Sequence, residues 1–378
     1  MPPTESAADV LIVGGGVTGM ACALHLAANG ARPLVVDWGG NAGSNANAGS
    51  LHVQLQSRFL RLYPHLAPNV EASLSLYVSA VDEWGELDAR HGPFQLVRGG
   101  GLMVAETDAQ LKFLAEKAER ERRHGVTAEI LHRRDLDAIA PWIGPHIVGA
   151  ELCGNEGKVN PLLANRALKA AATAAGARFV EDRVIALERT GNGVTAVGAK
   201  GTTRYSAGQV VIAAAWGSGG LAQSLGITAP TESEPLHMNI TEAAAYDIRH
   251  LVQHAERPIT LKQFESGQVV IGGGWPADKG AGDDAPSVRA DSLLGNVALA
   301  ARLAPAIAHL RVIRTWAGFN TTHDGKTILG RKGPIILAVP GDAGYTLGPL
   351  VGRAAAALAL DATPPFDLTP YSPARFAA

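Results

Sequence analysis

The hydrophobic pattern at the start of the chain has the order of a strand, a turn and a helix. Residues 9–13 form a short apolar run, three consecutive glycines follow, and residues 20–29 are rich in Ala and Leu. A second apolar run covers residues 32–36 and ends on Asp37. The continuously apolar segment 209–215 is typical of a strand buried in a parallel sheet. These patterns predict a βαβ unit within a doubly wound α/β fold.

The rest of the chain alternates between helical and strand-like patterns. Apolar residues at spacings of three and four predict a helix within residues 59–92. A charged helix is predicted over residues 108–124, and we interpret its charged face as solvent-exposed surface. Residues 230–313 contain short alternating strands and one helical segment, 287–303, which indicates an antiparallel α+β module inserted into the first fold. A last helix is predicted over residues 353–360.

The glycines after the first strand have the spacing Gly14-x-Gly16-x-x-Gly19. In a dinucleotide-binding fold the first glycine permits a tight turn, the second lets the backbone approach a pyrophosphate, and the third lets helix and strand pack closely. Asp37 lies 18 residues beyond Gly19, where it can accept hydrogen bonds from ribose hydroxyls. The helix N-terminus adds amide donors for phosphates. The complete βαβ context favours dinucleotide binding over a purely structural glycine turn.

Composition supports a folded protein with a large core. Of the 378 residues, 47% are hydrophobic and 18% are charged, which excludes disorder and a coiled coil. The 44 glycines exceed the average usage of about 7%. Because one hydrophobic core stops growing near ~250–300 residues, we expect two domains, or one domain with a large insertion.

Charge and cysteine content exclude several classes of function. The net charge is −2 without a basic block, so a nucleic-acid partner is not expected. No apolar run reaches the ~20 residues that span a bilayer, so no transmembrane segment is predicted. Cys22 and Cys153 form no C-x-x-C pair, which argues against zinc, iron–sulfur and disulfide frameworks. We predict no metal site and a cytoplasmic protein.

Seven motifs together resemble the FAD-dependent D-amino-acid oxidase superfamily, and they cover nearly the whole chain. They are Gly14-x-Gly16-x-x-Gly19 with Asp37, Asn47-Ala-Gly-Ser50, Gly157-x-Val-Asn-Pro161, Val211-Ile-Ala-Ala-Ala-Trp216, residues 263–273, Trp316-Ala-Gly318 with Asp324-Gly325, and Gly344-Tyr-Thr-Leu-Gly-Pro349. Within the superfamily, residues 47–54 are most similar to the β subunits of heteromeric opine (octopine and nopaline) oxidases or dehydrogenases and of D-hydroxyproline dehydrogenases.

The resemblance implies two domains, each assembled from separate segments. The doubly wound, Rossmann-like FAD-binding domain would comprise residues 1–80, 150–228 and 314–378. The antiparallel α+β substrate domain would comprise residues 81–149 and 229–313.

The resemblance also implies the residues that bind FAD. The ADP part would lie at Gly14, Gly16, Gly19 and Asp37, with Val184 near the adenine. The isoalloxazine ring would lie beside Ala48, Gly49 and Ser50, and would be closed off by Gly318 and by the turn formed by Gly344, Tyr345, Thr346 and Leu347. Some relatives link FAD to a C-terminal cysteine, but no cysteine follows Cys153 here. We therefore expect noncovalent FAD.

The substrate side departs from simple amino-acid oxidases. Asn320 stands where such relatives commonly carry an Arg that grips the substrate carboxylate. Val270 stands where some sarcosine oxidases place a lysine that helps dioxygen react, so a different electron acceptor is expected. The candidate catalytic residues are His52, His323 and Asn320, and the candidate substrate-binding residues are Gln54, Arg58, His237 and Lys262. Each has a structural alternative, because surface Arg and Lys are usually solvated and many His residues are structural.

The resemblance implies oxidation of an amine by hydride transfer to flavin N5, followed by hydrolysis of the imine. The expected substrate is a carboxylate-bearing secondary amine, an opine such as octopine or nopaline, which yields an amino acid and a 2-oxo acid. A second flavin or dinucleotide-fold subunit and a small iron–sulfur subunit are the implied partners. The alternatives are the β subunit of a D-hydroxyproline or proline dehydrogenase, a stand-alone glycine- or sarcosine-type oxidase, and a flavin-binding scaffold without catalysis.

Overall fold

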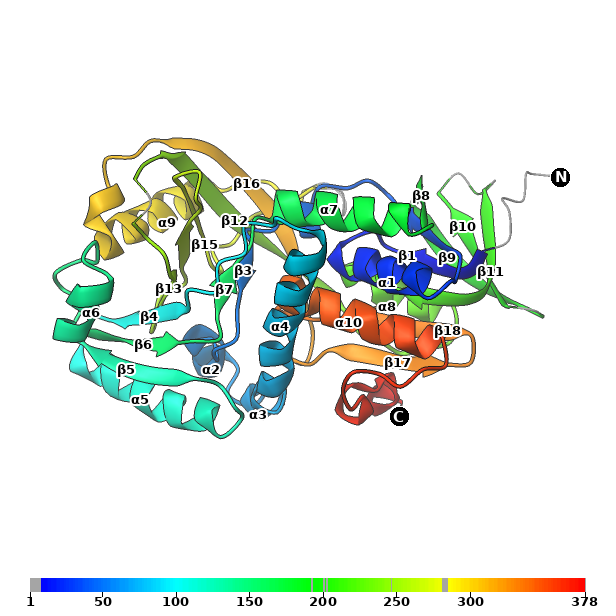
Figure 1. Ribbon diagram of the computed structural model, residues 1–378, viewed down its shortest axis with the longest axis horizontal. Helices are drawn as coiled ribbons and strands as arrows, with labels where there is room; N and C mark the ends of the chain where they lie inside the picture. The colour runs from blue at the N-terminus through cyan, green and yellow to red at the C-terminus, as the bar shows by residue number, and fades with distance from the viewer. Residues whose placement is uncertain are drawn as a thin grey trace.

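Two eight-stranded sheets follow one another along the long axis of the molecule (Figure 1). The computed structural model describes residues 8–191, 193–199, 201, 203–245, 247–280 and 285–377. The first sheet lies at the right of Figure 1 and the second at the left. A two-stranded ribbon of β3 (Ser50–Leu51) and β7 (Gly157–Lys158) lies between them.

The first sheet has the order β17-β18-β11-β1-β2-β8, with the antiparallel strands β9 and β10 attached to β11. Neighbouring strands from β18 to β8 run parallel, and β17 joins the edge in antiparallel orientation. The strands are β1 (Ala8–Val13), β2 (Pro33–Asp37), β8 (Arg178–Glu181), β9 (Val184–Thr190), β10 (Gly193–Gly198), β11 (Arg204–Ile212), β17 (Ile328–Lys332) and β18 (Ile335–Val339).

Both faces of the first sheet are covered, as its continuously apolar strands require. Val10 and Ile12 of β1 join the core on one face, and Leu11 and Val13 join the core on the other. The first face packs against α1 (Val17–Ala28), α4 (Leu74–His91), α7 (Pro161–Ala174) and α10 (Gly344–Ala359). The second face packs against β9, β10 and α8 (Ser218–Gln223). The doubly wound α/β fold is confirmed.

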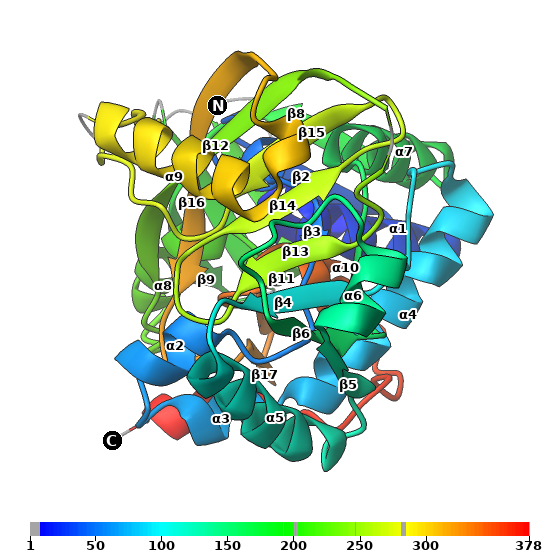
Figure 2. The same ribbon diagram turned by 90° about the vertical axis from the view of Figure 1, so that its left-hand side faces the viewer.

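The second sheet has the order β16-β12-β15-β14-β13-β4-β6-β5, and only the β4–β13 pair is parallel. Helices α9 (Ala290–Leu303) and α6 (Arg133–Ile139) cover its outer face, which is turned toward the viewer in Figure 2. The strands are β4 (Gly101–Ala105), β5 (Ala128–His132), β6 (Gly149–Cys153), β12 (Glu232–Ala243), β13 (Leu251–His254), β14 (Thr260–Gln263), β15 (Gln268–Gly272) and β16 (Val312–Thr322). The predicted FAD-binding segments 150–228 and 314–378 include most of β6 and β16, which belong to the second sheet. We propose that the two domains follow the two sheets, so that β6 and β16 are part of the substrate domain.

The helix predicted within residues 59–92 consists of three separate helices. These are α2 (Ser57–Leu62), α3 (Ala67–Glu71) and α4. Pro64 lies between α2 and α3, and Pro68 lies in the first turn of α3. Because proline has no backbone N–H, it favours a helix start over a helix interior.

The last helix begins nine residues earlier than the sequence pattern predicts, at Gly344 instead of Arg353. Pro349 lies inside it and has no N–H to offer the carbonyl of Tyr345 four residues earlier. The indole Nε1 of Trp84 on α4 donates to that carbonyl at 3.3 Å and to the carbonyl of Thr346 at 3.1 Å. A distant side chain therefore satisfies the group that Pro349 leaves open.

Helix α5 (Asp108–Arg122) carries charged residues on its buried side as well as on its exposed side. Lys112, Glu116 and Glu119 are exposed or partly exposed, as expected, but Lys117 and Glu121 are completely buried. The interpretation of the charged face as solvent-exposed surface is therefore wrong for these two residues, because they pair with each other and Lys117 also pairs with the buried Glu151 of β6.

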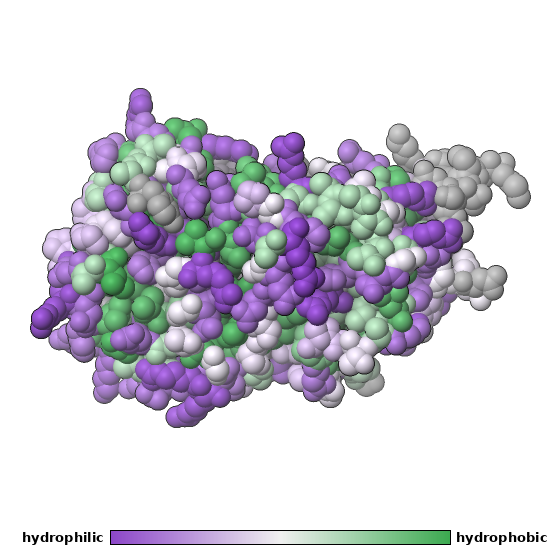
Figure 3. Space-filling model, viewed as in Figure 1, coloured by the Kyte–Doolittle hydropathy of each residue, from purple (hydrophilic) through white to green (hydrophobic). Residues whose placement is uncertain are grey.

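Polar and apolar residues are intermixed over the face of the molecule shown in Figure 3, as is usual for folded proteins. Among the helices of the described segments, none combines the length and apolar content needed to cross a membrane.

Candidate active site

A cavity of about 1230 Å³ lies between the two sheets. Its lining extends from Gly14, at the end of β1, to His323, just after β16. Pockets for single drug-sized ligands are about 300–1,000 Å³. This cavity therefore has room for a dinucleotide and a second molecule in one continuous space.

The predicted glycine turn has the close contacts that a dinucleotide fold requires. Gly14 has φ +105°, and a Cβ there would lie 2.4 Å from the carbonyl oxygen of Ala213. A Cβ at Gly19 would lie 1.9 Å from the oxygen of Gly14, so this glycine lets α1 pack against the turn. A Cβ at Gly16 would lie 2.9 Å from Ser44 Oγ. Gly14 and Gly16 line the cavity and Gly19 lies behind them.

Asp37 closes the same end of the cavity. Its Oδ2 accepts a hydrogen bond from the Gly15 N–H at 2.6 Å, and its Oδ1 accepts one from the Gly39 N–H at 2.9 Å. The carboxylate thus braces the glycine turn, and Asp37 and Val184 both line the cavity. Their predicted contacts with ribose and adenine stay proposals.

The loop before β3 borders the middle of the cavity. Gly49 has φ +79°, and a Cβ there would lie 2.0 Å from the oxygen of Val159. The Gly49 N–H donates to Asn47 Oδ1 at 2.7 Å, which fixes the turn. Ala48 and Ser50 line the cavity, whereas Gly49 is packed behind them. Two of the three residues predicted beside the isoalloxazine thus face the open space.

The far side of the cavity is formed by β16 and by the start of α10. A Cβ at Gly318 would lie 2.9 Å from the Cβ of Ala46, so a glycine is needed for this close approach. Gly344, Tyr345 and Thr346 form the first turn of α10 and line the cavity, whereas the Leu347 side chain points into the core. The N-terminus of this 16-residue helix supplies a partial positive charge there.

His52 and Gln54 both line the cavity, and the carboxylate of Glu156 lies behind them. The His52 N–H donates to Thr346 Oγ1 at 3.0 Å, and His52 Nδ1 lies 3.8 Å from Glu156 Oε1. Gln54 Nε2 donates to Glu156 Oε2 at 2.8 Å, and the Gln54 N–H donates to Oε1 at 3.1 Å. The buried glutamate thereby fixes the segment that follows the predicted flavin loop.

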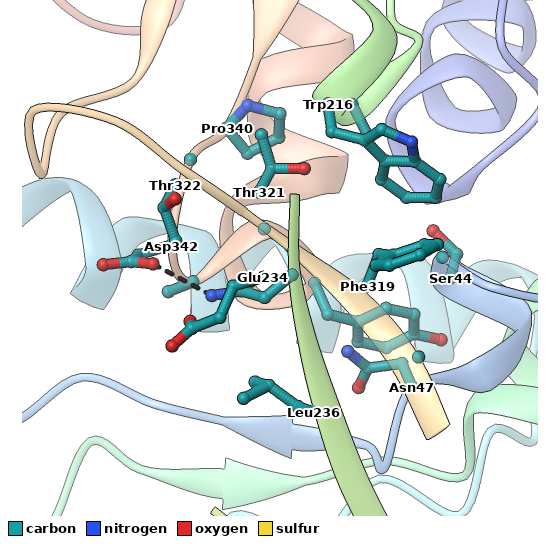
Figure 4. Close-up of a pocket in the computed structure, with 18 of the residues that line it drawn as sticks. Ser44, Asn47, Trp216, Glu234, Leu236, Phe319, Thr321, Thr322, Pro340 and Asp342 are labelled. Atoms are coloured by element: carbon teal, nitrogen blue, oxygen red, sulfur yellow. Dashed lines mark hydrogen bonds between the residues drawn. The ribbon is translucent and has the colours of Figure 1, made fainter. Parts of the chain in front are cut away.

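Asn320 and His323 line the cavity from the end of β16. Asn320 Nδ2 donates to Asp342 Oδ1 at 2.9 Å (Figure 4). The His323 ring packs edge-on against Phe376, with 5.0 Å between ring centroids.

Two predicted substrate-binding residues are not among the residues that line the cavity. His237 is completely buried, its Nε2 lies 2.9 Å from Asn239 Oδ1, and burial lowers its pKa. Lys262 is also completely buried, and its Nζ donates to Ser50 Oγ at 2.8 Å. Burial and the nearby Lys158 lower the pKa of Lys262 to about 7. The side chain of Arg58, the third such prediction, lies outside the described part of the structure.

A buried charge network lies behind His52 and Gln54, and nothing in the sequence pointed to it. Lys117 Nζ lies 2.7 Å from Glu121 Oε1 and 2.8 Å from Glu151 Oε2, and all three side chains are fully buried. Glu121 Oε1 also accepts the N–H of Leu55 at 2.6 Å. Burial raises the pKa of Glu151 to about 9 despite the opposing effect of Lys117. The spacing of Lys117 and Glu121 is equally typical of an exposed helical ion pair.

Further charged residues that the sequence analysis did not single out line the cavity, and they include Glu234, Arg257 and Asp342. The only sequence feature that pointed to this wall was Asn320, which stands where simple amino-acid oxidases commonly carry an Arg. Within the described ranges, no group of three or more His, Cys, Asp or Glu side chains is arranged to hold a metal ion.

The glycine turn at α1, the second helix N-terminus and the intervening cavity are those of a dinucleotide-binding protein. The chain belongs to the FAD dependent oxidoreductase family, DAO, whose model matches residues 9–358.

Curated relatives lie within the same range of activities. The chain is 27% identical to the B subunit of opine oxidase from Rhizobium meliloti over 329 residues, which cover 84% of this chain and 83% of that protein. It is 27% identical to glycine oxidase of Geobacillus kaustophilus over 379 residues, which cover 97% of each. The protein is thus an FAD-dependent oxidoreductase that acts on amino-acid or amine substrates.

Solved structures show the same fold. L-proline dehydrogenase from P. horikoshii superposes with a TM-score of 0.83 at 21% identity over 98% of both chains. Glycine oxidase from Geobacillus kaustophilus superposes with a TM-score of 0.80 at 23% identity, covering 97% of this chain and 98% of that one.

The residues of this chain fit FAD. A side chain at Gly14 or Gly16 would fill the cradle beneath the turn, and two helix N-termini face one cavity that is large enough for a dinucleotide. Gly14, Gly16 and Asp37 would hold the ADP part, and Ala48, Ser50, Gly318 and the first turn of α10 would hold the ring.

Proposed function

We propose that the protein oxidises a carboxylate-bearing secondary amine, an opine such as octopine or nopaline, to an amino acid and a 2-oxo acid. The observation that carries this proposal is the continuity of the cavity from the glycine turn, past Ala48 and Ser50, to Asn320 and His323. The relation to the B subunits of two opine oxidases supports an opine as the substrate.

When bound, FAD supplies the acceptor for the hydride that leaves the carbon beside the amine nitrogen. The protein has to align the amine and exclude bulk water. We propose that His52 and His323 handle the amine proton and that Asn320 hydrogen-bonds the substrate. Gln54, held by Glu156, would orient it from the opposite wall. Arg58 stays a predicted contact, and His237 and Lys262 would act only by supporting the cavity wall.

We also propose that the chain works within a heteromeric dehydrogenase. Its relatives include proteins named as the B subunit of opine oxidase and the beta subunit of sarcosine oxidase. The proposed partners are a second flavin or dinucleotide-fold subunit and a small iron–sulfur subunit that carries electrons away. Co-expression with the neighbouring genes, followed by pull-down and iron analysis, tests this arrangement.

A stand-alone glycine-type oxidase is the second candidate. The match to glycine oxidase covers 97% of both chains, which favours a chain that is active without partners. Asn320, in place of the expected Arg, favours a larger substrate.

Anaerobic reduction of the FAD-loaded chain separates the candidates. Octopine, nopaline, D-hydroxyproline, L-proline, sarcosine and glycine are each added, and the yellow flavin absorbance is followed. We expect bleaching by octopine or nopaline. Bleaching by glycine alone would support the second candidate, and bleaching by D-hydroxyproline or L-proline alone would point to a dehydrogenase for those substrates.

A further inference from the structure

The wall of the cavity around Asn320 is acidic. Glu234 on β12 lies directly opposite Asn320 on β16 in the antiparallel register, so both side chains leave the same face of the sheet. The carboxylate of Asp342 accepts a hydrogen bond from the Asn320 amide at 2.9 Å. Figure 4 shows Glu234 and Asp342 on the same side of β16, and all three residues line the cavity.

Within the described ranges, no cationic side chain pairs with Glu234. The side chain is half-buried, and none of the described residues forms an ion pair or hydrogen bond with it. A partly desolvated carboxylate without a partner is less stable than the same carboxylate in water. A ligand with a positive group at this wall would stabilise the Glu234 carboxylate and would also contact Asp342.

A different wall of the same cavity carries a basic side chain, Arg257. Arg257 lines the cavity, and its Nη2 binds Glu106, whereas its Nε and Nη1 make no hydrogen bond within the described chain. Carboxylates match the planar donor pattern of a guanidinium. This wall is therefore suited to the carboxylate of a substrate.

Two buried polar atoms close to Arg257 in the chain make no hydrogen bond to any described residue. His254 Nδ1 accepts the N–H groups of Glu256 and Arg257 at 2.9 and 3.0 Å, which assigns the ring proton to Nε2. Burial lowers the pKa of His254 to about 4, so the ring is a neutral donor. His254 Nε2 and Gln253 Oε1 are buried, and neither has a hydrogen-bond partner among the described residues. The nearest acidic atom to His254 Nε2 is Glu106 Oε2, at 3.9 Å, and that oxygen is already paired with Arg257. Because the side chains of His254 and Gln253 both line the cavity, they point to a polar ligand there.

The two walls are well separated. Strands β15 and β14 lie between β12, which carries Glu234, and β13, which precedes Arg257. Because Arg257 lies in the turn between β13 and β14, two to three strand spacings separate it from β12, or about 10–14 Å, more than a glycine-sized molecule can bridge. An extended substrate with opposite charges at its two ends can contact both walls.

We propose that the cavity selects an extended amine substrate with a second cationic group, a guanidinium or a primary ammonium, which binds at Glu234 and Asp342 while a carboxylate binds toward Arg257. This inference rests on the proposed function in assigning the cavity as the substrate site. Octopine and nopaline carry such a guanidinium, whereas sarcosine, glycine and D-hydroxyproline lack one.

The test uses the FAD-loaded full-length chain and a matched pair of ligands. L-Arginine and L-citrulline have nearly the same shape, but only arginine has a charged end group. Binding is measured at low ionic strength by flavin difference spectra and calorimetry, and octopine is compared with its citrulline analogue in anaerobic flavin reduction. Glu234→Gln and Asp342→Asn remove one charge each with little change of shape. Glu129→Gln, on the exposed side of β5, is the matched control.

We expect arginine to bind about two- to fivefold more tightly than citrulline, as is typical of a partly exposed charge pair. Glu234→Gln should remove most of this preference and Asp342→Asn part of it, while Glu129→Gln keeps it. Equal affinity for the two ligands, no binding of either, or an unchanged preference in both cavity variants would overturn the inference. Flavin absorbance of each variant verifies that it is folded and loaded.

The outcomes also separate this inference from the proposed function. If octopine and its citrulline analogue reduce FAD equally well, amine oxidation stands and the charge selection is wrong. If no amine reduces FAD but arginine is preferred in the wild type and not in Glu234→Gln, the charge selection stands and the proposed reaction is wrong.

Discussion

Replacing Glu151 by glutamine is expected to stabilise the protein at neutral pH. Glu151 is fully buried beside Lys117 and Glu121, and burial raises its pKa to about 9. At pH 7 its carboxyl is therefore protonated in the folded protein and ionised in the unfolded chain. A glutamine amide has nearly the same shape. It can accept from Lys117 and donate to Glu121, as the neutral acid does.

The magnitude follows from the pKa difference. The folded-state pKa of Glu151 is above the ordinary value of 4.5. The contribution of its protonated carboxyl to the free energy of unfolding is therefore complete below pH 4.5 and is lost as the pH rises toward about 9. From pH 4.5 to pH 7 the loss covers about 2.5 pH units at ~1.4 kcal/mol per unit, or about 3 kcal/mol. Glu151→Gln removes this loss. We expect it to be about 3 kcal/mol more stable than wild type at pH 7 and within ~1 kcal/mol of wild type at pH 5.

The assay is urea unfolding followed by tryptophan fluorescence, with saturating FAD in every sample. Lys262, whose pKa burial lowers to about 7, gives the opposite pH dependence above that pH, so pH 5 and pH 7 are the two conditions. Glu129→Gln, at an exposed position, controls for the loss of one carboxylate from the unfolded chain. A variant that is less stable at pH 7, or that gains equally at both pH values, would show that Glu151 is ionised in the folded protein.

Two further substitutions test the cofactor site and the start of α10. Gly16→Leu is expected to abolish FAD binding, because even a Cβ there would lie 2.9 Å from Ser44 Oγ; the purified variant should be colourless, whereas Gly191→Ala, whose Cβ meets no atom within 4 Å, should stay yellow. Trp84→Phe is expected to lower the free energy of unfolding by about 1–3 kcal/mol, because the buried carbonyl of Tyr345 loses its donor. Unchanged stability in urea unfolding would show that this carbonyl has another partner.

The βαβ unit was predictable because its signals are local. The apolar strand, the glycine spacing and Asp37 all lie within residues 9–37, and each reflects a contact inside that segment, such as the approach of Gly19 to Gly14. The antiparallel sheet was predictable for the same reason, from short alternating strands.

The features that the sequence did not reveal depend on distant partners. The early start of α10 depends on Trp84, 261 residues before Tyr345. The burial of Lys117 depends on Glu151, which comes from β6. The acidic wall depends on the register that pairs Glu234 with Asn320. Local periodicity carries no information on these pairings, and spacing alone could not exclude His237 and Lys262 from the cavity.

The central claim is that this chain oxidises a secondary amine on its own bound FAD. An anaerobic titration of the FAD-loaded chain with octopine, with parallel quantification of the 2-oxo acid released, tests it most directly. The account predicts that one equivalent of octopine bleaches one equivalent of flavin and releases one equivalent of 2-oxo acid. Flavin that stays oxidised with octopine, nopaline and every other amine tested would contradict it.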